Sequence, residues 1–217
     1  ILGEAQILGQ VKDAYNTARA SSSTGLVLNQ LFEKAFNVAK KVREETGISE
    51  RGVSISSAAV ELAKKIFDDL ENHSVMLVGT GEMAELAAKH LISYGVKTVY
   101  VASRTYERAI SLAQTLNGCA LDFDAFKEEL YRADIVITST SAPKFIINKE
   151  MIEKAIHKRK NKPIFLIDIA VPRDIAPEVN DLENVYLYDI DDLQNVVLRK
   201  SHTKQDSALR HLLQKLQ

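Results

Sequence analysis

The sequence predicts an α/β protein built on a doubly wound parallel sheet, with helical segments before and after it. Between residues 74 and 188, short and almost wholly apolar runs alternate with stretches of helical periodicity. Such runs are typical of strands that helices cover on both faces, because a strand with one solvated face would alternate apolar and polar residues. Alternation of strands and helices at this interval favours a parallel sheet.

Three helices are expected before residue 74. Apolar residues recur at helical spacing over residues 7–15 and again over residues 28–42, and Gly47 is expected to stop the second helix. The serines within residues 54–57 are expected to cap a third helix, whose apolar face continues to Phe67.

Five apolar runs are expected to form the strands of the sheet, and the segments between them its helices. The expected strands are residues 74–78, 98–102, 135–140, 164–169 and 185–188. The expected helices are residues 82–93, 105–116, 124–131 and 149–159.

After Asp189 the pattern returns to that of helices. One apolar stripe contains Ile190, Leu193 and Val196, and a second stripe covers residues 209–216. No sheet is evident against which this segment would pack. Two alternatives therefore stay open: the segment packs on a partner, or it folds back on its own domain.

The composition is that of an ordinary globular protein, with 46% hydrophobic and 26% charged residues. The net charge of −1 gives no global reason to expect nucleic-acid binding, although it leaves room for a local basic patch. The sequence shows no signal peptide and no run of the ~18 apolar residues that a membrane span needs, so we expect a cytoplasmic protein. Because the chain starts at Ile1 and stops inside a helical pattern, we expect it to be a fragment.

The stretch GTGEMA at residues 79–84 is the strongest functional signal. It directly follows the strand expected at 74–78 and opens the helix expected at 82–93. In that setting the first glycine permits a tight turn, the second lets the backbone approach a pyrophosphate, and the alanine allows close packing of helix on strand. Amides at the helix start would face the anion. We therefore expect a Rossmann domain that binds a dinucleotide, the alternative being a glycine pair that only makes a turn. The residues assigned to the cofactor here are Gly79, Thr80, Gly81, Glu82, Met83 and Ala84.

The end of the second strand favours NADPH over NADH. An NAD site usually has an acidic residue there, which binds the ribose hydroxyls, whereas this strand leads into Ser103, Arg104 and Thr105. The guanidinium of Arg104 suits a 2′-phosphate, and the two hydroxyls would add hydrogen bonds. The alternative is that Arg104 is an ordinary surface arginine.

Two further stretches follow strands, at the edge of the sheet where ligands bind in such folds. Residues 138–143 offer hydroxyls and amides to the nicotinamide half of the cofactor, and we assign Ser139 to it. Residues 168–174 place charged groups after the next strand, and for Asp168 a structural and a functional role stay equally open.

The remaining candidates for chemistry are one cysteine and five histidines. Cys119 follows an Asn–Gly pair that stops a helix, and we expect it to be a buried strand cysteine rather than a nucleophile. A single cysteine also rules out a disulfide framework. The histidines show no metal-ligand spacing, so no metal site is expected.

Several motifs in fixed order resemble the glutamyl-tRNA reductase family. The first is GEAQILGQVK at residues 3–12. It is followed by the GTGEMA loop, by SRT at 103–105, by IDIAVPRD at 167–174 and by YDIDDL at 188–193. The likeness covers the whole chain, although family members often have proline at position 5 and asparagine at position 103.

The resemblance implies an enzyme that reduces glutamyl-tRNA to glutamate-1-semialdehyde with NADPH, the first step toward tetrapyrroles such as porphyrins and haem. In the family a cysteine forms a thioester, which accepts hydride better than an ester does. That cysteine would lie upstream of Ile1, and Cys119 does not match it, so the chain has no catalytic residue and is expected to be inactive alone. The positions that match the family's substrate site are Glu4, Ala5, Gln6 and Gln10.

The resemblance also implies three segments and a set of partners. Residues 1–50 would be the C-terminal helical part of a catalytic domain, 51–188 the NADPH-binding domain, and 189–217 the start of a long linker helix leading to a dimerisation domain. The implied partners are glutamyl-tRNA, a second copy of the chain and the downstream aminomutase, with no membrane. Two other classes stay open: a shikimate-dehydrogenase-like oxidoreductase, against which the first fifty residues count, and a non-catalytic nucleotide-binding or partner-binding module.

Overall fold

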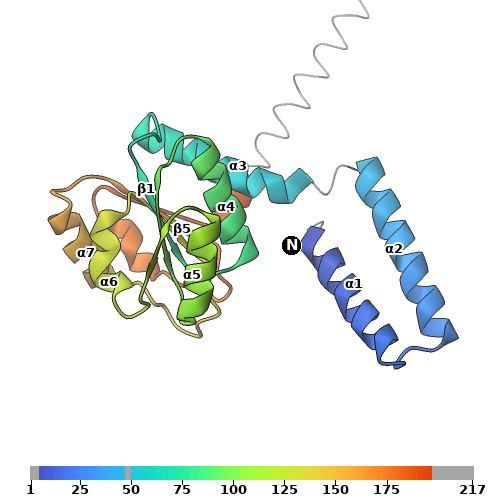
Figure 1. Ribbon diagram of the computed structural model, residues 1–217. Helices are drawn as coiled ribbons and strands as arrows, with labels where there is room; N and C mark the ends of the chain where they lie inside the picture. The colour runs from blue at the N-terminus through green and yellow to red at the C-terminus, as the bar shows by residue number, and fades with distance from the viewer. Residues whose placement is uncertain (1–4, 47–49, 197–217) are drawn as a thin grey trace, which may run out of the picture. The chain divides into compact units, whose positions relative to one another are not determined.

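The computed structural model describes residues 5–46 and 50–196. The chain divides into two compact units, residues 1–54 and residues 55–217 (Figure 1).

The first unit is a pair of helices, α1 (Ala5–Ala20) and α2 (Leu26–Thr46). Tyr15 of α1 is buried, with its ring stacked on Phe32 at 5.0 Å and edge-on to Phe36 at 5.7 Å. Its hydroxyl donates to Asn29 Oδ1 at 3.2 Å, so the polar end of the ring is paired as well. These contacts confirm the two helices expected from the apolar spacing. Gly47, expected to stop the second helix, lies outside the described residues.

The second unit contains a six-stranded sheet in the order β3-β2-β1-β4-β5-β6, in which every neighbouring pair is parallel. This is the strand order of a doubly wound dinucleotide-binding fold. The strands are β1 (Ser74–Val78), β2 (Thr98–Ala102), β3 (Cys119–Leu121), β4 (Ile135–Thr138), β5 (Ile164–Asp168) and β6 (Val185–Asp189).

Helices cover both faces of the sheet, as Figure 1 shows for α4 and α5 on one side and α6 and α7 on the other. Alternate strand residues divide between two apolar cores: Leu77 and Ile137 pack with α4 and α5, while Met76 and Val136 pack with α6 and α7. The helical elements are α3 (Glu50–Phe67), α4 (Glu82–Ser93), α5 (Tyr106–Thr115), α6 (Phe126–Glu129), α7 (Lys149–Lys158) and the 3₁₀ turns η1 (Leu130–Arg132) and η2 (Pro177–Asp181).

Two of the expected elements need correction. The helix α3 begins at Glu50 and runs through residues 54–57, which were expected to cap it. Ile55 and Ser56 are buried, so tertiary packing overrides the preference of serine for caps. The strand β3 was not among the five expected strands; its three residues, although apolar, are too few to stand out as an apolar run.

The start of the C-terminal segment packs on its own domain. Residues 190–196 are helical, and Leu193 is fully buried in the core that also contains Leu77. Ile190 and Val196 pack against the same core. For this part of the segment, folding back on the domain is therefore the correct alternative. The second apolar stripe, residues 209–216, lies outside the described residues.

Candidate functional site

A tight turn joins β1 to α4 at the carboxyl edge of the sheet. Gly79 has a φ of +102°, which L side chains rarely adopt, and its N–H donates to the carbonyl of Ala102 at 2.8 Å. Gly81 is the residue before α4 and brings no capping side chain. The N-terminus of α4, with its first-turn amides, thus lies at the carboxyl edge of the sheet, as in an anion site at a helix start.

The turn lies directly against the segment that follows β4. A Cβ atom added at Gly79 would lie 2.2 Å from the carbonyl oxygen of Ser139, and one at Gly81 would lie 2.2 Å from Ser139 Oγ. Gly79 therefore requires glycine even without a ligand, because a backbone carbonyl fills the space a side chain would need, whereas at Gly81 the Ser139 hydroxyl would have to rotate away.

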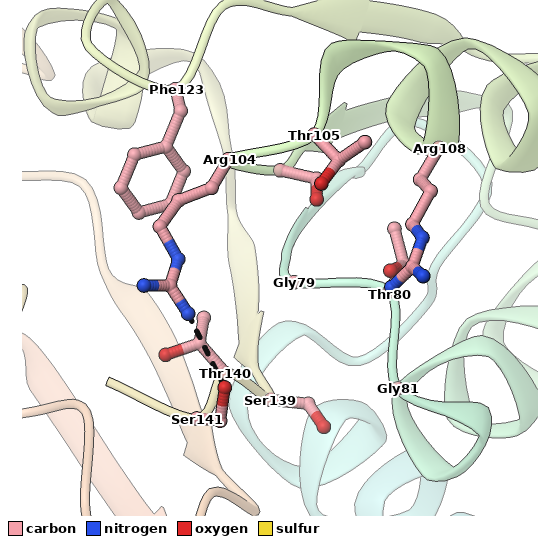
Figure 2. A pocket seen from close by; sticks show the side chains of 11 residues that line it. Gly79, Thr80, Gly81, Arg104, Thr105, Arg108, Phe123, Ser139, Thr140 and Ser141 are labelled. Carbon is pink, nitrogen blue, oxygen red and sulfur yellow. Dashed lines mark hydrogen bonds between the residues drawn. The ribbon is translucent and has the colours of Figure 1, made fainter. Parts of the chain in front are cut away.

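The turn, the end of β2 and the segment after β4 enclose a cleft of about 360 Å³ (Figure 2). It opens between the ends of β1 and β4, where the strand order reverses and where ligands bind in open α/β sheets. The lining residues are Gly79, Thr80, Gly81, Ser103, Arg104, Thr105, Arg108, Phe123, Ser139, Thr140 and Ser141.

Seven of the ten residues assigned to the cofactor from the sequence line this cleft: Gly79, Thr80, Gly81, Ser103, Arg104, Thr105 and Ser139. Glu82, Met83 and Ala84 belong to α4 and are outside the lining. Ala84 is fully buried in the core, in keeping with the close packing of helix on strand expected there.

Two arginines give the cleft positive charge. Figure 2 shows Arg104 extending from the end of β2 toward Ser141, where its Nη2 donates to Oγ at 3.2 Å. Arg108 projects from α5 toward the glycine turn (Figure 2). Among the described residues that line the cleft, none is acidic. Arg108 is not among the residues assigned from the sequence; its place in the first turn of the helix that follows Arg104 was the available signal.

Asp168, at the end of β5, is almost fully buried and has four hydrogen-bond donors. Its Oδ1 accepts from the Thr138 hydroxyl and the Ala170 amide, each at 3.1 Å. Its Oδ2 accepts from the amides of Asp174 and Ile175, each at 2.9 Å. Since both oxygens are engaged within the fold, the contacts favour the structural role of the two left open.

A second buried carboxylate, Asp174, holds the segment that forms one wall of the cleft. Its Oδ2 accepts from the Thr140 amide at 2.8 Å, and its Oδ1 accepts from the Thr140 hydroxyl at 2.5 Å. Burial raises the pKa of Asp174 above its ordinary value, against the hydrogen bonds from Thr140 that lower it. From the sequence, Asp174 was only the last residue of a charged stretch, and its contact with Thr140 was not predicted.

The helical turn at 190–196 is fixed by a reciprocal cap. Asp189 Oδ1 accepts from the amides of Asp191 and Asp192, and Asp192 Oδ2 accepts from the Asp189 amide. Arg173 forms ion pairs with Asp189 and Asp191. Burial acts to raise the pKa of Asp189, but the hydrogen bonds from Arg173 and from the backbone outweigh it and hold that pKa below its usual range.

The residues assigned to the substrate belong to the other unit. Ala5, Gln6 and Gln10 lie on α1, where Gln10 is exposed, and Glu4 lies outside the described residues. Cys119 begins β3 and is exposed, so the expectation of a buried cysteine is wrong. β3 is the edge strand of the sheet, where packing around the side chains is least complete.

Within residues 5–46 and 50–196, no three His, Cys, Asp or Glu side chains gather as they would around a metal ion. None of the helices there combines the length and the hydropathy that crossing a bilayer requires.

Comparison with known proteins adds a family to this geometry. Residues 1–46 match the model described as "Glutamyl-tRNAGlu reductase, N-terminal domain", and residues 61–196 match "Shikimate / quinate 5-dehydrogenase". A glutamyl-tRNA reductase of Magnetococcus marinus is 52% identical over 208 residues, which are 96% of this chain and 49% of that protein. The chain spans about half the length of the curated relatives it matches.

Solved structures also show a similarity to glutamyl-tRNA reductases. "Glutamyl-tRNA Reductase from Methanopyrus kandleri" is 40% identical with a TM-score of 0.64, over 99% of this chain and 57% of that one. The nucleotide-binding domain of the Thermoplasma volcanium glutamyl-tRNA reductase is 20% identical with a TM-score of 0.55, over 70% of this chain and 96% of that one, and supports the fold alone. The chain therefore belongs to the glutamyl-tRNA reductase family, and its residues 61–196 form a domain of the type that the shikimate / quinate 5-dehydrogenase model describes.

Proposed function

We propose that the cleft above β1 and β4 binds NADPH, and that the chain is the cofactor-binding part of an enzyme that reduces glutamyl-tRNA to glutamate-1-semialdehyde. The observation that carries the NADPH proposal is the pair Arg104 and Arg108 in a cleft whose described lining has no acidic residue. Two guanidinium groups suit a 2′-phosphate, whereas the ribose hydroxyls of NADH would call for a carboxylate.

The residues present fit each part of the cofactor. The glycine turn at 79–81 and the start of α4 would hold the pyrophosphate. Ser103, Arg104, Thr105 and Arg108 would hold the 2′-phosphate, and Ser139 would lie beside the nicotinamide half. When bound, NADPH supplies a hydride; the chain's own part is to bind and orient it.

The names of the relatives support the reaction. We propose that this family reduces the glutamyl ester after a cysteine outside this chain has captured it as a thioester, which makes the carbonyl a better hydride acceptor. Glu4, Ala5, Gln6 and Gln10 would contribute to the glutamyl site. In the complete protein, residues 1–50 would belong to the catalytic domain, 51–188 would bind NADPH, and 189–217 would begin a linker helix to a dimerisation domain.

A homodimer, a cytoplasmic location and contact with the downstream aminomutase are part of the same proposal. They rest on the family resemblance rather than on a contact in this chain.

Hydrogen exchange with and without NADPH tests the site. Bound cofactor should slow amide exchange at residues 79–84 and 138–142, since these segments line or adjoin the cleft. Exchange at α7 serves as the internal control, because this helix belongs to the same unit and contributes no residue to the lining of the cleft. Binding without protection at the glycine turn would contradict the proposed site.

The match of residues 61–196 to the shikimate / quinate 5-dehydrogenase model supports a second candidate, a dehydrogenase of that type. The match of residues 1–46 to a glutamyl-tRNA reductase domain counts against it. Incubation of the chain with NADP⁺ and shikimate or quinate distinguishes the two. We expect no reduction of NADP⁺, and steady formation of NADPH would favour the second candidate.

A further inference from the structure

One wall of the cleft is the segment of residues 139–141, which leaves the end of β4. This wall lies against the glycine turn, with the Ser139 carbonyl and side chain in the space beside Gly79 and Gly81. It also carries the hydroxyl of Ser141, to which Arg104 donates across the cleft (Figure 2). The position of the wall therefore decides how far the cleft opens.

Thr140, at the centre of the wall, is held from behind by the carboxylate of Asp174. Both carboxylate oxygens are engaged, one by the Thr140 amide at 2.8 Å and one by its hydroxyl at 2.5 Å. The same hydroxyl accepts from the Ala142 amide at 3.1 Å, which continues the fixed path of the segment. Because Asp174 contacts both the backbone amide and the side chain of Thr140, it fixes the position of the Thr140 backbone and the rotamer of its side chain.

Asp174 is in turn fixed at its backbone. Its amide donates to Asp168 Oδ2 at 2.9 Å, and its carbonyl accepts from the amides of Ile146 and Ile147 at 2.7 and 3.1 Å. Its side chain is fully buried, and Asp174 is not one of the described residues that line the cleft. It thus joins the loop after β5 to the wall after β4 without reaching the space where a ligand would lie.

A buried carboxylate reduces stability unless donors compensate for its lost hydration. Here each carboxylate oxygen accepts from one donor of Thr140. An amide of the same size has one acceptor oxygen and one donor group, so it would have to share that oxygen between the two donors or reverse the bond to the Thr140 hydroxyl, and it would lose the charge that strengthens both bonds.

We propose that Asp174 is a positioning residue for the cofactor, setting the 139–141 wall against the glycine turn through its two hydrogen bonds with Thr140. This inference rests on the proposed binding of a nicotinamide dinucleotide in the cleft. The Ser139 end of the wall adjoins the glycine turn, which serves the part of the cofactor that NADPH and NADH share, while Ser141 contacts Arg104. Loss of the Asp174 carboxylate should therefore weaken the binding of both, NADH by about tenfold for one lost charge-assisted bond and a displaced wall, and NADPH by at least as much.

The test uses the whole 217-residue chain and measures dissociation constants for NADPH and NADH by nicotinamide fluorescence. The variants are Asp174→Asn, Thr140→Val, Thr140→Ser and the double variant Asp174→Asn/Thr140→Val. We expect Thr140→Ser to bind like the wild type, since it keeps both donors. The double variant should bind the cofactors no more weakly than Asp174→Asn alone, because both substitutions break the same contact between Asp174 and Thr140.

Asp134→Asn is the matched control. Asp134 is also a carboxylate that joins loops, since it accepts from the Ser74 amide and from Arg159, but it lies at the amino edge of the sheet. Urea unfolding of each variant reports its stability. We expect Asp134→Asn to lose stability with unchanged affinity for both cofactors, and Asp174→Asn to lose affinity while it is still folded.

The possible outcomes distinguish a failure of the role inferred for Asp174 from a failure of the proposed cofactor binding. If the wild-type chain binds neither nucleotide, the proposed function fails. If the wild type binds but folded Asp174→Asn binds equally well, or if the effects of Asp174→Asn and Thr140→Val simply add, the inference is overturned and the proposed function stands.

Discussion

The two arginines of the cleft come from different elements and approach it from different sides. Arg104 follows β2 and contacts Ser141 on the opposite wall, whereas Arg108 projects from α5 toward the glycine turn (Figure 2). If one phosphate is held by both guanidinium groups, each charge-assisted bond would contribute about 1.5–3 kcal/mol.

Replacement of Arg108 by alanine should weaken NADPH binding by about tenfold and leave NADH binding unchanged, since NADH has no 2′-phosphate. Titration of both nucleotides by fluorescence gives the two constants. Arg132→Ala is the matched control, because Arg132 is an exposed arginine outside the cleft, paired with Glu129. An equal loss for NADH would show that Arg108 acts on the shape of the cleft rather than on the phosphate.

Gly79→Ala should destabilise the folded chain by about 2–4 kcal/mol, from an unfavourable positive φ and a clash with the Ser139 backbone. A Cβ there would lie 2.2 Å from a carbonyl oxygen, which no side-chain rotation relieves. Gly9→Ala is the control, as nothing lies within 4 Å of its Cβ. Urea unfolding measures both, and a Gly79→Ala variant as stable as the wild type would contradict the described turn.

Among single residues, the sequence predicted those whose place in the cleft depends on a local motif. Gly79, Gly81 and Arg104 were found because a strand, a turn and a helix start are neighbours along the chain. Asp174 and Thr140 are 34 residues apart, and only the pairing of β4 with β5 brings them together. The exposure of Cys119 likewise depends on which strand lies at the sheet edge.

Among the elements, the helical segment at 190–196 is held in place by contacts at the end of β6. Its start is fixed by the Asp189 cap and by Arg173, and its apolar side by Leu193. Arg173 comes from the loop that also contains Asp174. The loop after β5 thus contacts both the wall of the cleft and the start of this segment.

The stability that Asp189 contributes should depend on pH. Its pKa is lowered in the folded protein, so its contribution is present above its ordinary value of 3.8 and is lost as the pH falls through the lowered value. Asp189→Asn should therefore cost about 1 kcal/mol near neutral pH. The difference between wild type and variant should shrink below about pH 3.8. Urea unfolding over a pH series measures it, and a difference that grows toward acid pH would contradict the account.

The elements that the sequence predicted least well are those with a weak apolar pattern. The apolar runs of the long strands identified the sheet and its parallel type. The strand β3 has only three residues, and the serines in α3 are more common at helix starts than inside helices. The packing of Leu193 required knowledge of the sheet that it covers.

For the whole molecule, the relevant fact is that the chain spans about half of its curated relatives. The described cleft is proposed to hold the hydride donor, while the proposed acceptor chemistry needs a cysteine that Cys119 does not match. The chain is thus expected to perform the binding step without the reaction.

Incubated with glutamyl-tRNA and NADPH, the 217-residue chain should give no glutamate-1-semialdehyde above background. Product analysis of the aldehyde, with a complete glutamyl-tRNA reductase as the positive control, checks this. Turnover by this chain would show that a residue within it captures the glutamyl group, and would overturn the proposed thioester route.

The most direct test of the central claim is the ratio of the NADPH and NADH dissociation constants for the wild type and for Arg104→Ala, at one fixed ionic strength. We predict that the wild type binds NADPH at least about tenfold more tightly than NADH, and that Arg104→Ala loses most of this preference. Equal affinities in the wild type, or a preference that survives in Arg104→Ala, would contradict the assignment of the cleft to NADPH through its 2′-phosphate.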